Sequence, residues 1–311
     1  MTRYIFILLI SISALYAKES VPTLRSADGK KTIQASPIGV EGKKVIFRKK
    51  DGSTFGSSIQ NFSPQDQEKL KTWMNALQTD PHYKLIDRVQ KSKHLRVLFI
   101  GNSYSFHVPK AFEKIAEKRK KKITVEQVTS GGCTLARHAK SEKLLEKIQN
   151  GKYDVVVLQE QSMRPSFPEA QRSKEMDAAA NTLVTSIKKS GAIPVFFQTW
   201  GRKNGDQQNK AVFPDDTFDK MQARLVTGYE NVAKACGGDI HIVPVGMLWK
   251  KGIDQDQNLA DKLFSPDGSH PAKEGVRFTA AAFFSALYDE PLDDKVQNHT
   301  DDAQLLPIPF Q

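Results

Sequence analysis

The sequence contains only two cysteines, Cys133 and Cys236, among its 311 residues. Two cysteines exclude a disulfide framework, although one bond between them and two free buried thiols are equally good interpretations. No cluster of His, Cys, Asp or Glu has metal-ligand spacing, so we expect neither a metal nor another cofactor. Beyond the first 17 residues no apolar run is long enough to span a bilayer, and we expect no stable membrane span.

Acidic residues are outnumbered, with 35 Asp and Glu against 46 Lys and Arg, which gives a formal net charge of +11. The densest basic cluster, residues 117–122, is expected at the C-terminal end of a helix, where cations complement the helix dipole. A solvated helix end is favoured there over a polyanion-binding patch, and an anionic glycan is the alternative partner. No aromatic residues interleave this cluster, so we expect no nucleic-acid partner.

The N-terminus has the pattern of a signal peptide, residues 1–17. Arg3 supplies a positive charge, an apolar run covers residues 5–12, and small residues lead to Ala17. We therefore expect a bacterial protein that is secreted or periplasmic, with an uncleaved anchor as the alternative. At the other end, residues 293–311 are expected to form a C-terminal tail.

Residues 18–78 predict a small β domain with a trailing helix. Turn dipeptides such as Glu41-Gly42 and Asp51-Gly52 separate short alternating runs, and Ser63 followed by Pro64 has the pattern of a helix start. The segment resembles an SH3-like barrel of the Sla-homology type, which implies a binding or spacing role. Residues 79–94 are expected to be a linker.

From residue 95 onward the pattern alternates between strand and helix. Five strands separated by helices predict a parallel sheet that is covered on both faces. Ligands bind such sheets beyond the carboxyl ends of the strands, so the residues just after each strand are the candidates for a site. The expected strands are 97–100, 123–128, 155–158, 193–199 and 240–245, and the expected helices are 110–120, 139–149, 170–189, 216–235 and 271–287.

The first of these strands ends in Gly101, followed two residues later by Ser103. The glycine permits a sharp turn, which would expose the Ser103 hydroxyl near a helix N-terminus as a candidate nucleophile. A serine needs a base, and His270 precedes a proline at the start of the last helix. Asp267 lies three residues before His270, a spacing that lets its carboxylate orient the imidazole in a tight turn.

Two further segments could stabilise an oxyanion together with the Ser103 N–H. Gly131 or Gly132 follows the second strand and can present a backbone N–H, and the Gln161 side-chain amide follows the third strand. If Cys133 is a free thiol, it is a second candidate nucleophile, weaker than Ser103, because it directly follows these glycines.

These four segments in this order resemble the SGNH (GDSL-type) hydrolases over residues 95–292. The resemblance implies a three-layer αβα, flavodoxin-like domain with a five-stranded parallel sheet of order 2-1-3-4-5. It also implies that Ser103 is the nucleophile, His270 the base and Asp267 its orienting acid, with Gly131 and Gln161 in the oxyanion hole. The chain departs from the family where Gln161 replaces the usual Asn, and where Asn102 stands at a common Asp position.

Asn102, Trp200 and Arg164 are candidate substrate-binding residues, because each follows an expected strand. Trp200 could form a pocket wall, with core or rim packing as the alternative. Arg164 could hold an anionic substrate group, with a solvated surface position as the alternative. The resulting hypothesis is an exported serine esterase that hydrolyses an acyl ester, with an acetyl group on a small molecule or a polysaccharide as the expected substrate. Two alternatives are a glycan acyltransferase with the same site and a non-catalytic glycan-binding protein on a hydrolase fold.

Overall fold

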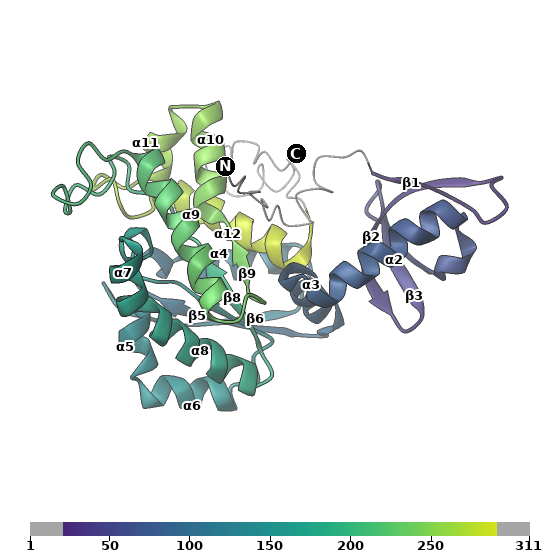
Figure 1. Cartoon of the computed structure of the whole chain (residues 1–311), viewed down its shortest axis with the longest axis horizontal. Coiled ribbons are helices and arrows are strands. Elements are labelled where there is room, and N and C mark those ends of the chain that lie inside the picture. Colours follow the sequence, from purple (N-terminus) through teal and green to yellow (C-terminus); the bar gives the residue numbers. More distant parts are fainter. Residues whose placement is uncertain (1–20, 291–311) are drawn as a thin grey trace, which may run out of the picture. The chain divides into compact units, whose positions relative to one another are not determined.

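The computed structural model describes residues 21–290, which divide into two compact units, 21–87 and 88–290 (Figure 1). The expected signal peptide and C-terminal tail lie outside the described residues. None of the helices in the described part of the chain is long and apolar enough to cross a membrane.

The smaller unit is built on an antiparallel sheet in the order β1-β2-β3-β4. A two-residue turn at Gly42, which has a φ of 59°, joins the two long strands at the expected Glu41-Gly42 position. Phe47, Phe62 and Trp73 are buried in a core beneath the sheet. The strands are β1 (Thr23–Arg25), β2 (Thr32–Glu41), β3 (Lys44–Lys49) and β4 (Thr54–Ser57).

A short helical turn, η1 (Ile59–Asn61), leads into the helix α2 (Pro64–Thr79). Ser63 caps this helix as the sequence predicts, since its hydroxyl accepts the Asp66 N–H at 3.3 Å. The SH3-like class of this domain stays a prediction. The expected linker, 79–94, largely consists of another helix, α3 (Pro81–Lys91).

The larger unit contains a five-stranded parallel sheet in the order β6-β5-β7-β8-β9. Numbered along the chain, this is the order 2-1-3-4-5, so the predicted fold class is confirmed. Because the strands are parallel, their carboxyl ends share one edge of the sheet. The strands are β5 (Leu95–Gly101), β6 (Ile123–Thr129), β7 (Val155–Leu158), β8 (Ile193–Phe197) and β9 (His241–Val243).

Alternate residues of the central strand β5 pack into two layers. Leu98 and Ile100 join a buried cluster with α5, α6, α8 and α9, whereas Phe99 contacts Phe112 of α4 and Phe283 of α12 on the other face. Figure 1 shows α8 and α12 on opposite sides of the sheet. The helices are α4 (Val108–Lys118), α5 (Leu135–Ala139), α6 (Glu142–Asn150), α7 (Glu169–Arg172), α8 (Ala178–Lys189), α9 (Phe218–Ala235), α10 (Val245–Gln255), α11 (Leu259–Leu263) and α12 (Lys273–Tyr288).

Several helices differ from the expected ones. The single helix expected over 139–149 is instead α5 and α6, because Ser141 caps a new helix by accepting the Leu144 N–H. The long helix expected over 170–189 is divided by a π-helical turn, η4 (Ser173–Asp177). The sequence analysis missed α10 and α11. Gly246 and Gly252 lower the helix propensity of the α10 segment, so its sequence does not indicate a helix. The structure requires glycine at position 246, because a Cβ there would lie 2.2 Å from the Thr199 carbonyl oxygen.

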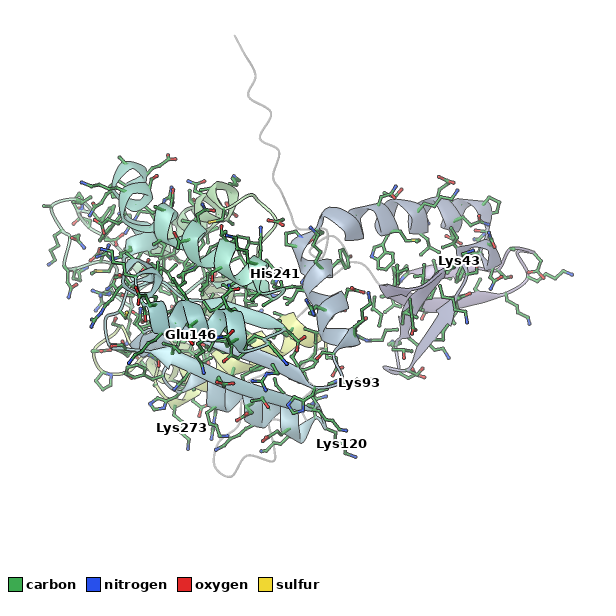
Figure 2. The ribbon with its side chains drawn as sticks, turned by 90° about the horizontal axis from the view of Figure 1, so that it is seen from below. Lys43, Lys93, Lys120, Glu146, His241 and Lys273 are labelled. Atoms are coloured by element: carbon green, nitrogen blue, oxygen red, sulfur yellow. The ribbon has the colours of Figure 1, made fainter. Side chains whose placement is uncertain are left out.

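The basic cluster 117–122 lies at the end of α4, as expected. Lys122 accepts the Leu95 N–H through its carbonyl oxygen, which places the cluster where β5 and β6 begin. Lys121 forms an ion pair with Glu290 at 2.6 Å. Figure 2 shows Lys93 and Lys120 at this end of the larger unit. The cluster is therefore at the sheet edge opposite the end of β5 that carries Ser103.

Candidate active site

Gly101 ends β5 because its neighbours leave no room for a side chain. A Cβ on Gly101 would lie 2.5 Å from Oε1 of Gln159 and 3.0 Å from Oγ of Ser105. Gln159 is fully buried, and its Oε1 accepts hydrogen bonds from the Asn102 N–H at 2.9 Å and the Ser105 hydroxyl at 3.0 Å. These bonds fix the turn that precedes η2 (Ser103–Ser105), and thereby the position of Ser103.

The structure brings together the three residues predicted to form a catalytic triad. Oγ of Ser103 lies 2.8 Å from Nε2 of His270, and Nδ1 of His270 lies 2.6 Å from Oδ2 of Asp267. Both distances are those of good hydrogen bonds. The His270 and Asp267 side chains are about half exposed, so the line of three groups is open to solvent.

The Asp267–His270 turn is held by the carboxylate itself. Oδ1 of Asp267 accepts the backbone N–H groups of Ser269 and His270, each at 2.9 Å, while Oδ2 faces the imidazole. Burial acts to raise the pKa of Asp267, but these hydrogen bonds and the charge interaction with His270 outweigh it and lower the pKa. The carboxylate is therefore ionised at neutral pH and favours the His270 tautomer that carries its proton on Nδ1.

The pocket-wall interpretation of Trp200 is wrong, and the alternative of core packing describes its position. Its side chain has no exposed surface, because it stacks between Tyr104 and Trp249 at ring-centroid distances of 4.9 and 4.0 Å. Its indole N–H donates to the Ser269 carbonyl oxygen at 3.0 Å. Trp200 thus supports the turn that carries His270, and it does not face a substrate.

Asn102 was also predicted to bind substrate, and its contacts contradict that role. The side chain is buried, with 2 % of the residue exposed. Its Nδ2 donates to the Cys133 carbonyl oxygen at 3.0 Å, and its Oδ1 accepts the Tyr104 N–H at 3.2 Å. Asn102 therefore ties the glycine loop after β6 to the serine turn after β5.

The glycine loop places two candidate N–H donors beside this turn. The Cys133 N–H donates to the Ser130 carbonyl oxygen at 3.0 Å, which closes a turn over Gly131 and Gly132. Gly132 has a φ of 63°, and a Cβ on Gly131 would meet no atom within 4 Å. Gly131 therefore tolerates a side chain that Gly132 does not, and the choice between their N–H groups stays a prediction.

Gln161 follows β7 and is half-buried. Its Oε1 accepts the Met163 N–H at 3.0 Å. Within residues 21–290 its amide nitrogen has one weak hydrogen-bond partner, Oγ of Ser162 at 3.4 Å. The NH₂ group is thus largely unsatisfied, and its role as an oxyanion donor stays a prediction.

Two other sequence interpretations change with the structure. Arg164, predicted to hold an anionic substrate group, forms an ion pair with Glu175, so its charge is already balanced. Cys133 and Cys236 are free and buried, and burial raises the pKa of both thiols. A buried thiol with a raised pKa is a poor nucleophile, which disfavours Cys133 as an alternative to Ser103.

The sequence analysis missed Glu160, which is fully buried beside the site. Its carboxylate accepts the Leu135 N–H at 3.2 Å and the Gln161 N–H at 2.6 Å. Burial raises its pKa to about 7, and the two backbone hydrogen bonds only partly oppose that rise. The available signal was an acidic residue directly after a fully apolar strand, a position where a charge is seldom solvated.

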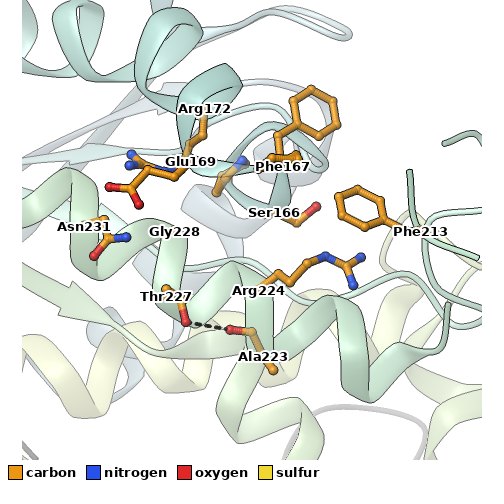
Figure 3. Close-up of a pocket in the computed structure, with 12 residues that line it drawn as sticks. Ser166, Phe167, Glu169, Arg172, Phe213, Ala223, Arg224, Thr227, Gly228 and Asn231 are labelled. Carbon is orange, nitrogen blue, oxygen red and sulfur yellow. Dashed lines mark hydrogen bonds between the residues drawn. The ribbon is translucent and has the colours of Figure 1, made fainter. Parts of the chain in front are cut away.

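A separate hollow of about 360 Å³ lies between the η3–α7 segment and α9 (Figure 3). It is lined by residues that include Phe167, Phe213 and Arg224. η3 (Arg164–Ser166) contributes one wall. None of the triad residues lines this hollow, so the hollow and the Ser103–His270 pair are different places on the larger unit.

No protein-family model matches the sequence, and no curated protein matches it significantly. Among solved structures, a protein from Slackia heliotrinireducens provisionally assigned to the SGNH hydrolases has a TM-score of 0.50 and 24 % identity. The match covers 62 % of this chain and 99 % of that one. A DUF4886 family protein from Bacteroides uniformis has a TM-score of 0.53 and 20 % identity, and the match covers 68 % of this chain and 87 % of that one. The larger unit therefore has the three-layer α/β fold of the SGNH hydrolases.

Proposed function

We propose that the larger unit is a serine esterase that hydrolyses acyl esters. The hydrogen-bonded line from Ser103 through His270 to Asp267 is the observation that supports this proposal best. A hydroxyl, an imidazole and an ionised carboxylate in this order form the arrangement that activates serine for attack on a carbonyl carbon. Its position at the carboxyl ends of the strands agrees with where ligands bind such sheets.

In the proposed reaction, Oγ of Ser103 attacks the ester carbonyl carbon while Nε2 of His270 accepts the hydroxyl proton. Asp267 holds the Nδ1–H and stabilises the imidazolium that forms. The tetrahedral intermediate then collapses, the alcohol leaves with the proton from His270, and the acyl group remains on Ser103. Water attacks this acyl-enzyme with His270 again as the base, which releases the carboxylic acid.

The negative charge that develops on the carbonyl oxygen needs hydrogen-bond donors. We assign the N–H of Ser103, the N–H of Gly131 and the amide of Gln161 to this task. In support, the Ser103 N–H has no partner among the described residues, and the Gln161 amide has only the weak contact described above. A donor of this kind typically contributes about 3 kcal/mol to the transition state.

The proposed substrate is an acetyl or similar acyl ester on a carbohydrate, and the proposed location is outside the cytoplasm. The substrate class follows from the resemblance of the motifs to the SGNH hydrolases, and the location follows from the signal-peptide pattern in residues 1–17. The small N-terminal domain would then bind or space the enzyme relative to its substrate.

A serine-reactive phosphonate tests the proposal directly. We expect the purified protein to hydrolyse 4-nitrophenyl acetate, to lose that activity on treatment with the phosphonate, and to carry the label on Ser103 when its peptides are mapped by mass spectrometry. Absence of turnover together with absence of labelling would refute the esterase assignment. Labelling at another residue would refute the assigned nucleophile.

A further inference from the structure

Arg202 lies in the loop that follows β8, at the same sheet edge as Ser103. Its side chain is half-buried. Nη2 has a weak contact with Oγ of Ser162 at 3.4 Å. Nε is covered by protein and has no hydrogen-bond partner among residues 21–290. The covered Nε cannot reach a ligand, so the Nη groups are the donors that a ligand could meet.

The backbone holds Arg202 in place. The N–H of Gly201 donates to Oε1 of Gln222 at 2.8 Å, and the N–H of Arg202 points at the sulfur of Met221 at 3.3 Å, both on α9. The next residue, Lys203, donates its N–H to the Gly268 carbonyl oxygen at 2.8 Å. The loop is therefore attached both to α9 and to the turn that carries His270, which preorganises the guanidinium beside that turn.

Tyr104 links Arg202 to the reacting residues. The Tyr104 ring meets the imidazole of His270 edge-on, with 5.3 Å between ring centroids, and its hydroxyl lies 2.6 Å from Oγ of Ser269. Burial raises the pKa of Tyr104, while hydrogen bonds with Ser269, Ser162 and Arg202 and the positive charge of Arg202 act against that rise. The guanidinium therefore lies close to the Tyr104 hydroxyl, within one aromatic side chain of His270.

Three other arginines around this end of the sheet that are buried or half-buried have acidic partners, whereas the exposed Arg137 has none among the described residues. Ion pairs join Arg164 to Glu175, Arg172 to Asp177 and Arg224 to Asp216. Among the residues that the structure describes, no carboxylate lies within ion-pair distance of Arg202. A half-buried charge without a counter-ion is costly, because burial removes solvating water and neutral hydrogen-bond partners replace it only in part. An anion supplied by a ligand would remove that cost.

We propose that Arg202 binds an oxyanion group of the substrate, so that the enzyme prefers esters that carry a carboxylate or a sulfate near the scissile bond. An O-acetylated uronic acid or sulfated sugar has this chemistry. The guanidinium fork suits two oxygen atoms of such a group. This inference rests on the proposed esterase function and adds the charge of its substrate.

The test compares three monoacetylated sugars that differ only in one substituent. They are an acetylated methyl galactopyranoside, the corresponding galactopyranosiduronate and the corresponding 6-sulfate. We expect kcat/KM for at least one charged sugar to exceed that for the neutral sugar by roughly 10- to 100-fold, the range for a hydrogen-bonded charge pair. Which charged sugar is preferred identifies carboxylate or sulfate as the group bound.

Three variants assign the preference to Arg202. Arg202→Gln removes the charge and should abolish the preference, bringing kcat/KM for the charged sugars to the value for the neutral sugar. Arg202→Lys keeps the charge but lacks the forked guanidinium, so it should retain part of the preference for charged sugars. Lys203→Gln removes the neighbouring charge, which pairs with Asp261, and should leave the preference unchanged.

The outcomes separate this inference from the esterase proposal. Hydrolysis of all three sugars at equal kcat/KM by the unmodified protein would overturn the role of Arg202 and leave the esterase intact. An equal loss for charged and neutral sugars in Arg202→Gln would also overturn it, since Arg202 would then only support Tyr104 and its neighbours. If no ester is hydrolysed, the esterase proposal fails. Calorimetric titration with methyl galactopyranosiduronate and its 6-sulfate counterpart then still decides whether Arg202 binds an oxyanion, because it needs no turnover.

Discussion

The hydroxyl oxygen of Ser103 lies 2.8 Å from Nε2 of His270, although 167 positions separate the two residues along the chain. Ser103 follows the central strand β5, and His270 precedes α12. The two elements are packed together through Phe99 and Phe283, whose rings are 5.0 Å apart. The core of the larger unit, rather than any local feature, therefore brings the proposed nucleophile to its base.

Replacing Ser103 by alanine removes the proposed nucleophile. We expect Ser103→Ala to lower kcat for 4-nitrophenyl acetate by at least about 10³-fold, since the rest of the site cannot form an acyl-enzyme. The melting temperature should stay within about 2 °C, because only one partly buried hydrogen bond is lost. Ser190→Ala, at the end of α8, is the control and should retain full activity. Comparable activity in the two variants would contradict the assignment.

Replacing Asp267 by asparagine tests the proton-transfer line one step further back. The amide oxygen of Asp267→Asn can still accept the N–H groups of Ser269 and His270, so the turn should keep its shape. The neutral amide cannot stabilise an imidazolium, and its NH₂ group disfavours the His270 tautomer that carries its proton on Nδ1. We expect kcat to fall roughly 10³- to 10⁴-fold, with KM changed much less.

The control for Asp267→Asn is Asp261→Asn, which removes a nearby exposed carboxylate that pairs with Lys203. We expect steady-state kinetics of this variant to match the unmodified protein within about twofold. If both variants lose activity to the same extent, the effect comes from the charge of the surface and not from the orientation of His270.

The sequence was sufficient for the parts of the fold and site that depend on local pattern. Buried parallel strands read as apolar runs, and the turns at Gly101 and between Asp267 and His270 depend on neighbours in sequence. Helix α10 was missed because Gly252 lowers its apparent helix propensity. A Cβ there would lie 2.8 Å from Leu259, a close approach that only the packed structure reveals.

The substrate-facing residues could not be predicted in this way, because exposure is decided by tertiary packing. Trp200 and Asn102 follow strands, as site residues do, yet both are covered by other elements. Arg164 and Arg202 are equivalent by sequence position, each following a strand. They differ in that Glu175 neutralises Arg164, whereas Arg202 has no acidic partner among the described residues.

Adding a methyl group at Gly101 tests how β5 sets the position of Ser103. The new Cβ would overlap Gln159, which is fully buried and cannot move without breaking its bonds to Asn102 and Ser105. We expect Gly101→Ala to lose about 1 to 3 kcal/mol of stability, and activity to fall because the serine turn shifts. Calorimetry and ester hydrolysis measure the two effects.

The matched control is Gly131→Ala, in the neighbouring loop. A Cβ there meets no atom within 4 Å, and the backbone N–H is retained. We expect its melting temperature to change little. Equal destabilisation by the two substitutions would mean that close packing at Gly101 is not what fixes the turn.

Glu160 should make the stability of the larger unit depend on pH. Its pKa is about 7 in the folded protein, against 4.5 when solvated, because burial disfavours the charged form. Below pH 4.5 the carboxyl is protonated in both states and costs nothing. As the pH rises from 4.5 to 7 the unfolded chain releases the proton first, so this group lowers the free energy of unfolding. Above pH 7 the loss is complete, at about 3 kcal/mol.

Glu160→Gln cannot ionise, and its amide oxygen can still accept the Leu135 or Gln161 N–H. We expect the variant and the unmodified protein to have similar stability near pH 4.5, and the variant to become more stable by about 3 kcal/mol near pH 8. Urea unfolding followed by near-UV circular dichroism of the stacked Trp200–Trp249 pair measures this in the larger unit. Glu146→Gln, an exposed position on α6 (Figure 2), should reproduce the unmodified pH dependence. If the stability difference between Glu160→Gln and the unmodified protein stays constant with pH, the pKa of Glu160 is the same in the folded and the unfolded protein. The hydrogen bonds from Leu135 and Gln161 would then fully offset the effect of its burial.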